Sequence, residues 1–143
     1  MYLNEQYLLV FWGIAALIFL LFVQWLVASM VKAAQPGAIP GKVDPQLDHH
    51  SFVFRAHRTF SNSLENSPAM FGTSVLAVLV GVKPEWAALC VWVLIAARVL
   101  HMALYYVMAT NSNPSPRSYA FMLGVLANLA LFGLCINALL AHT

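Results

Sequence analysis

Charged residues are scarce in this chain of 143 residues: they make up 8% of it, whereas hydrophobic residues make up 62%. An ordinary soluble domain is about a quarter charged. A small globule as apolar as this chain could not cover its surface with polar groups. The scarcity of charge therefore excludes a soluble domain and predicts an all-α integral membrane protein, short enough to be one domain over residues 1–143.

Cysteine and basic runs are also scarce. Cys90 and Cys135 both lie inside apolar runs, where free cysteines behave as small buried hydrophobes. No Cys-x-x-Cys pair or Cys/His spacing predicts a zinc or haem site, so we expect no metal. The formal net charge is only +2 and the basic residues form no run, which gives no reason to expect a nucleic-acid partner.

The sequence contains several long apolar runs. A bilayer core needs about 20 apolar residues per helix, and Tyr7 to Val31 meets this requirement and is too long for a cleaved signal peptide. We expect four transmembrane helices, over residues 5–33, 50–81, 85–108 and 117–141. One long and two short connections between them predict an up-down bundle. Five of the basic residues flank the first and third connections, and only Lys83 lies in the second; the five are Lys32, Lys42, Arg55, Arg58 and Arg117. Because Lys and Arg gather on the cytoplasmic side, both termini should face away from the cytosol.

Two of the expected helices carry a polar stripe. On the second helix the stripe is less than about 90° wide, at 100° per residue, and comprises Arg55, Arg58, Asn62 and Glu65. On the third helix it comprises Arg98, His101 and Tyr105. The stripes overlap in depth at roughly 12 to 15 Å from the cytosolic side, at 1.5 Å per residue. Arg117 and Ser118 lie above them, at the cytosolic start of the fourth helix.

These stripes hold more positive than negative charge. A charge in hydrocarbon costs at least about 2.5 kcal/mol on insertion scales, so such groups face a cavity or one another. Glu65 can neutralise Arg98 or Arg58. It cannot neutralise both of them and Arg117, so the surplus predicts an anionic ligand in a cytosol-facing pocket.

Other polar residues receive simpler interpretations. Pro68 cannot donate to the carbonyl of Leu64, so we expect the second helix to be bent or opened there. His49 and His50 are adjacent and therefore not on one helix face, and we expect both to be solvated loop residues.

The segments RAHRTFSNSLEN and ARVLHMALYY resemble the MAPEG superfamily, the membrane-associated proteins of eicosanoid and glutathione metabolism. The pattern Arg-x-x-x-Asn-x-x-Glu is present as Arg58, Asn62 and Glu65. The pattern Arg-x-x-(His or Tyr)-x-x-x-Tyr is present as Arg98, His101 and Tyr105. An arginine opening the fourth helix, here Arg117 beside Ser118, completes the set, and the likeness spans nearly the whole chain.

The resemblance implies a homotrimer that binds glutathione between neighbouring subunits near the cytosolic side. The six residues of the two patterns would bind glutathione, with Glu65 at its amino end and arginines at its carboxylates. Arg117 would stabilise the thiolate, and Ser118 stands where some relatives place a catalytic serine. The implied activity is transfer of glutathione to a hydrophobic electrophile from the bilayer, with reduction of lipid hydroperoxides as a further activity. One departure is Asn66, where members similar to leukotriene C synthase have an aromatic residue.

Three alternatives stay open at this point. A small proton-coupled multidrug or solute transporter could use Glu65 as its membrane carboxylate, although nearby arginines would hold that acid ionised. A haem or quinone protein could use His57 and His101. A non-catalytic member of the same superfamily could bind a lipid or a protein partner.

Overall fold

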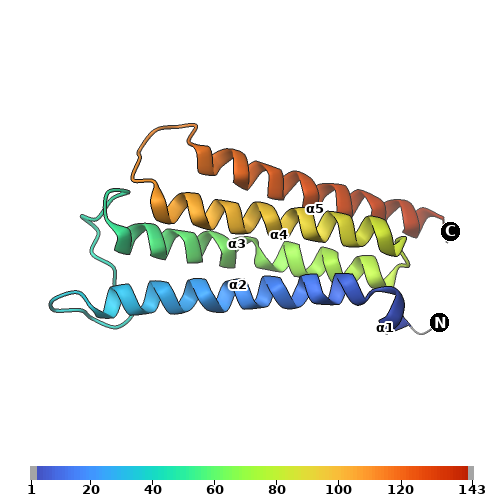
Figure 1. The fold of residues 1–143 in the computed structure, drawn as a ribbon, viewed down its shortest axis with the longest axis horizontal. Helices are drawn as coiled ribbons and strands as arrows, with labels where there is room; N and C mark the ends of the chain where they lie inside the picture. The colour runs from blue at the N-terminus through green and yellow to red at the C-terminus, as the bar shows by residue number, and fades with distance from the viewer. Residues whose placement is uncertain (1–2, 142–143) are drawn as a thin grey trace.

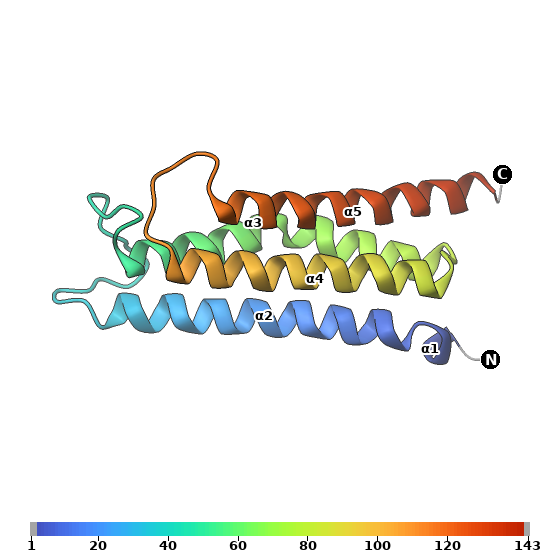
Figure 2. The ribbon, with the colours of Figure 1, turned by 45° about the horizontal axis from the view of Figure 1, so that its top comes forward.

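The computed structural model describes residues 3–141, and the regular structure of these residues is entirely helical. A short helix precedes four long ones: α1 (Leu3–Gln6), α2 (Leu8–Ala33), α3 (Phe52–Leu79), α4 (Pro84–Val107) and α5 (Pro116–Leu140). The long helices lie side by side and alternate in direction (Figure 1, Figure 2). The loops 34–51 and 108–115 meet at one end, and the α3–α4 turn and both termini meet at the other. The prediction of an all-α bundle is confirmed.

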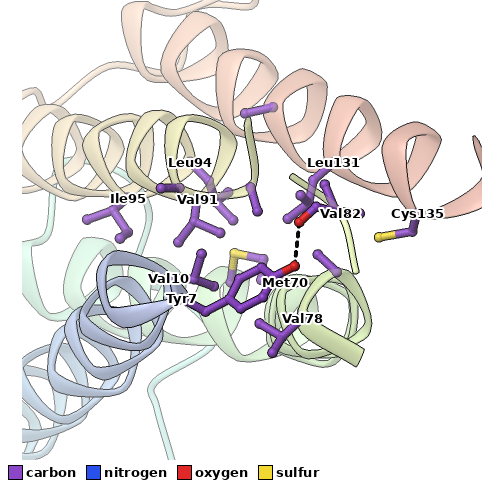
Figure 3. Packing of buried hydrophobic residues seen from close by; sticks show 14 of the residues in the cluster. Tyr7, Val10, Met70, Val78, Val82, Val91, Leu94, Ile95, Leu131 and Cys135 are labelled. Carbon is purple, nitrogen blue, oxygen red and sulfur yellow. Dashed lines mark hydrogen bonds between the residues drawn. The ribbon is translucent and has the colours of Figure 1, made fainter. Parts of the chain in front are cut away.

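The first predicted helix, residues 5–33, is interrupted at Tyr7, which lies between α1 and α2. Tyr7 is only 3% exposed, and its hydroxyl donates a hydrogen bond of 2.6 Å to the carbonyl of Val82 (Figure 3). The ring joins a cluster of buried apolar residues that includes Val10, Val91 and Leu131. The start of the bundle is thereby tied to the α3–α4 turn.

Glycine permits two features of this packing. A side chain at Gly13 would collide with Val91, so the missing Cβ lets α2 approach α4 closely. Gly81 has φ +74°, a left-handed conformation that costs glycine little, and it follows the end of α3. Pro84 then opens α4, where its missing N–H leaves no helical bond unmade.

α3 continues through Pro68, and its ribbon opens locally near the middle (Figure 1). The proline cannot donate to the carbonyl of Leu64. The hydroxyl of Ser67 donates to that carbonyl instead, at 2.8 Å. This substitute bond explains why an opened turn is tolerated inside a long helix.

Among the helices of the described residues, α2, α4 and α5 are long and apolar enough to cross a membrane. Their outward surfaces carry large apolar side chains such as Trp12, Phe19 and Leu126. α3 has 28 residues but falls below this level of apolarity because its first half carries the polar stripe. Composition therefore supports three of the four expected spans.

Candidate functional site

Arg98 joins the polar stripes of α3 and α4. It is 2% exposed, and its Nη2 donates to Asn62 Oδ1 at 2.9 Å and to Ser63 Oγ at 2.6 Å. Its Nε is buried and has no hydrogen-bond partner. Both of its partners are neutral, so the guanidinium charge is buried without an acid to balance it.

A row of side-chain contacts runs from Arg98 to Arg117. The guanidinium of Arg98 lies 5.9 Å from the ring centre of Phe121, and that ring lies 6.0 Å from His101. His101 meets Tyr105 edge to face at 5.5 Å. The guanidinium of Arg117 lies over the Tyr105 ring at 4.4 Å, a cation–π contact. The polar stripe of α4 and the start of α5 therefore form one continuous row of contacts.

Arg58 and Glu65 lie on the outer side of α3. Their side chains are 44% and 61% exposed, and Arg58 Nη1 is 3.9 Å from Glu65 Oε1. Among residues 3–141 this loose contact is the one ion pair with a nitrogen–oxygen distance within 4 Å. Of the two expected pairings of Glu65, the structure shows the one with Arg58. Asn62 lies between them on the helix and reaches Arg98, so α3 links the exposed pair to the buried cation.

Arg117 is held on one side and unpaired on the other. Its Nη2 donates to the carbonyl of Thr110 at 3.0 Å, whereas its Nη1 is buried without a partner. Ser118 belongs to the cap of α5: its Oγ accepts from the Ser115 amide at 3.3 Å and lies 3.2 Å from Ser115 Oγ. The cap fixes the first turn of α5, and with it the position of Arg117.

Arg55 was grouped with the ligand-facing stripe, but the structure gives it another partner set. It is 8% exposed, and its guanidinium donates to the carbonyls of His49, His50 and Tyr106 at 2.8, 2.9 and 3.3 Å. These bonds fasten the loop 34–51 to the end of α4. Arg55 thus holds backbone through its two terminal nitrogens, while its Nε is buried without a partner. Arg58, Arg98 and Arg117 are the cations of the candidate site that do not hold this loop.

His49 lies in the loop, as expected, but it is half-buried and not fully solvated. Its Nδ1 lies 3.4 Å from the Tyr105 hydroxyl, and its ring contacts Phe54 edge to face at 5.0 Å. Sequence spacing could not reveal this contact, because a loop residue has no helical register relative to α4. Ser63 and Phe121 were missed for a similar reason: each looks like ordinary packing until Arg98 is placed between them.

We predict that His49 titrates below the ordinary histidine value of 6.5. Burial lowers its pKa, and the positive charge of Arg117 lowers it further, while Asp48 opposes both. The folded state therefore favours neutral His49. That contribution to stability is complete above about pH 6.5 and is lost as the pH falls through the lowered pKa. Proton NMR of the histidine ring in detergent measures the midpoint. Arg117→Ala should raise it, Lys83→Leu should leave it unchanged, and a wild-type midpoint above 6.5 contradicts the arrangement.

A cleft of about 200 Å³ opens between α3, α4 and α5. Its lining combines polar Asn66, Arg98 and Asn128 with apolar side chains such as Phe121. Arg98 therefore touches both the polar cluster and this cleft. No group of three or more metal-ligand side chains gathers in the described part of the chain.

A protein-family model described as the MAPEG family matches residues 9–137. The match covers nearly all of the four long helices and both loops that surround the site. Comparison with curated proteins finds no match.

Proposed function

The chain belongs to the MAPEG family, and on that premise we propose that it binds glutathione and transfers its thiolate to a hydrophobic electrophile. The family match and three helices able to cross a membrane make it an integral membrane protein. The family includes glutathione transferases and related synthases together with non-catalytic members. Its membership thus supports a glutathione-related membrane enzyme or a relative of one.

The buried charge of Arg98 carries the proposal. Its guanidinium donates hydrogen bonds to neutral Asn62 and Ser63 and has no carboxylate partner, and Arg117 also keeps a buried N–H without an acceptor. Unbalanced cations at membrane depth are costly and mark ligand sites by default. Glutathione has two carboxylates, a thiol and one ammonium. It would therefore supply anions to the arginines and a cation to Glu65.

Each residue then has a role. Arg58 and Arg98 bind carboxylates, Asn62 orients Arg98, and Glu65 binds the ammonium. His101 and Tyr105 form the wall between them and Arg117. A guanidinium beside a thiol favours the charged thiolate, which is the nucleophile. Arg117 would therefore activate the sulfur of glutathione, and Ser118 would donate a hydrogen bond to it.

Attack of the thiolate on an electrophile R–X forms a C–S bond, breaks the C–X bond and releases X⁻. With a lipid hydroperoxide, two glutathione molecules become the disulfide, and the products are an alcohol and water.

The proposed assembly follows from exposed surfaces. α3 connects the end of α2, at the loop end of the bundle, to the start of α4, at the opposite end (Figure 1). If α2 and α4 cross the membrane, α3 must therefore cross it too. Arg58 and Glu65 would then face lipid unless a neighbouring copy covered them. We propose the homotrimer, with glutathione at this face and the loop end in the cytosol, where the basic residues gather.

Glutathione binding tests the proposal directly. Arg58→Ala and Glu65→Ala should each weaken binding about tenfold or more, because each removes a charge-assisted hydrogen bond. Isothermal titration of detergent-purified protein measures the affinity. Lys42→Ala is the matched control, since it removes an exposed cation outside the cluster. Absence of binding by the wild-type protein would reject the proposal, and proton-gradient-dependent uptake through Glu65 would then favour the transporter.

A further inference from the structure

His49 is a titratable side chain to which the proposed reaction gives no role. It belongs to the loop 34–51, at the end of the bundle where the loop 108–115 also lies (Figure 1). The side chain is half-buried, so part of it packs against protein and part stays open to solvent. The adjacent His50 is exposed. The fold therefore brings one of these two neighbouring histidines toward the candidate site and leaves the other outside it.

Tyr105 connects His49 to Arg117. The Tyr105 hydroxyl lies 3.4 Å from His49 Nδ1, and the centres of the two rings are 5.7 Å apart. The guanidinium of Arg117 lies 4.4 Å from the centre of the same Tyr105 ring. Phe54 packs edge to face against His49, with 5.0 Å between ring centres, and restrains its position. One side chain thus separates His49 from the arginine that is proposed to hold the thiolate.

The proposed reaction requires a group that accepts the thiol proton. The pKa of a free cysteine thiol is about 8.5, so glutathione arrives at neutral pH chiefly as the thiol. Arg117 can stabilise the thiolate, but its guanidinium is already fully protonated and cannot take up a proton. The proton acceptor must therefore be another group close to Arg117.

The surroundings of His49 favour its neutral form. The titratable and charged groups that face it are Asp48 of its own loop, Arg55 and Arg58 of α3, Tyr105 of α4 and Arg117 of α5. Burial and the three arginines lower the pKa of His49 below 6.5, while Asp48 opposes them. At neutral pH the ring is therefore an unprotonated base, and the same cations favour release of any proton that it accepts.

We propose that His49 accepts, through the hydroxyl of Tyr105, the proton that bound glutathione loses as its thiolate forms. The S–H bond breaks, sulfur keeps the electron pair, and the proton passes to the Tyr105 oxygen. The proton of that hydroxyl passes to Nδ1 of His49, and the imidazolium then loses a proton to water. The distance of 3.4 Å is long for this transfer, but such hydrogen bonds often shorten once substrate is bound. The inference rests on the proposed function and adds a proton acceptor to it.

Stopped-flow ultraviolet absorbance of the thiolate, after glutathione is mixed with the detergent-purified full-length protein, tests the proposal. His49→Gln should slow thiolate formation about 100-fold or more, the range for loss of a general base. The final amount of thiolate should stay unchanged, because Arg117 sets it. Added imidazole should restore much of the rate, because it can accept the proton in place of the missing ring. His50→Gln, at the exposed neighbouring histidine, is the matched control and should keep the wild-type rate.

The pH dependence of the wild-type rate gives a second test that needs no variant. Protonated His49 cannot accept another proton, so the rate of thiolate formation should fall as the pH drops through the His49 midpoint measured by proton NMR. This test also serves if His49→Gln does not fold. A wild-type profile without an inflection at that midpoint overturns the inference.

The remaining outcomes separate this inference from the proposed function. A wild-type rate in His49→Gln overturns the inference alone, provided that calorimetry shows glutathione binding and the thiolate forms. A slow His49→Gln variant that imidazole does not restore also overturns it, since His49 then only orders the loop. Absence of glutathione binding by the wild-type protein rejects the proposed function and, with it, this proton transfer.

Discussion

Replacing Arg98 with leucine is expected to weaken glutathione binding about 10- to 100-fold, the range for losing a buried hydrogen bond to a charged group. The same change should leave the bundle at least as stable. The guanidinium is buried without a carboxylate, and replacing buried charge by apolar side chains is often neutral or stabilising. The loss of bonds to Asn62 and Ser63 offsets part of that gain. Calorimetry and thermal unfolding in one detergent measure the two effects.

Opposite movement of affinity and stability distinguishes a ligand site from a structural contact. If Arg98 only joined α3 to α4, Arg98→Leu would lower stability and spare binding of glutathione by the folded fraction. Arg98→Lys keeps the charge but cannot reproduce a planar guanidinium with two partners, so it should restore binding only in part. Lys83→Leu removes an exposed cation at the far end of the bundle and should change neither quantity.

Replacing Arg117 with alanine is expected to raise the thiol pKa of bound glutathione by about one to three units, the usual effect of losing an adjacent opposite charge. At neutral pH the thiolate fraction, and with it kcat, should fall, by up to about a thousandfold. Arg117 suits this role because Thr110 and the Tyr105 ring fix it while Nη1 stays unpaired. Ultraviolet absorbance of the thiolate against pH gives the pKa, and conjugation of chlorodinitrobenzene gives kcat.

The comparison with Arg117→Lys shows whether charge alone is sufficient. Lysine keeps a cation near the same position and should retain most of the thiolate. Lys42→Ala removes a cation from the adjacent loop and should have no effect on the thiol pKa. Full thiolate formation in Arg117→Ala would show that another group activates sulfur, and the activating role would then pass to a different residue.

The helices were largely predictable from the sequence because their causes are local. Long apolar runs predicted α2, α4 and α5. The break at Tyr7 was not predictable, since it depends on a hydrogen bond to Val82, far away in the chain. The opening of α3 at Pro68 was expected, but its repair by Ser67 was not.

The candidate site was predictable as a set of residues but not as an arrangement. Helical spacing placed Arg55, Arg58 and Asn62 on one stripe, yet neighbouring segments of the same chain divide that stripe. Arg55 turns to the loop carbonyls, Arg58 remains exposed, and Asn62 meets Arg98. A rotation of about 60° around the helix separates Arg55 from Arg58, at 100° per residue, which is enough to assign them to different neighbours.

By itself, the sequence determined that this is a helical membrane protein of the MAPEG family with more basic than acidic groups near one end, because apolarity and charge are properties of composition and local spacing. Only the tertiary structure decided which cations stay unbalanced and which are satisfied by backbone. It also brought His49 to Tyr105 and set Asn128 beside the cleft. These contacts join residues far apart in the chain, and their geometry depends on how the helices pack, which no local pattern encodes.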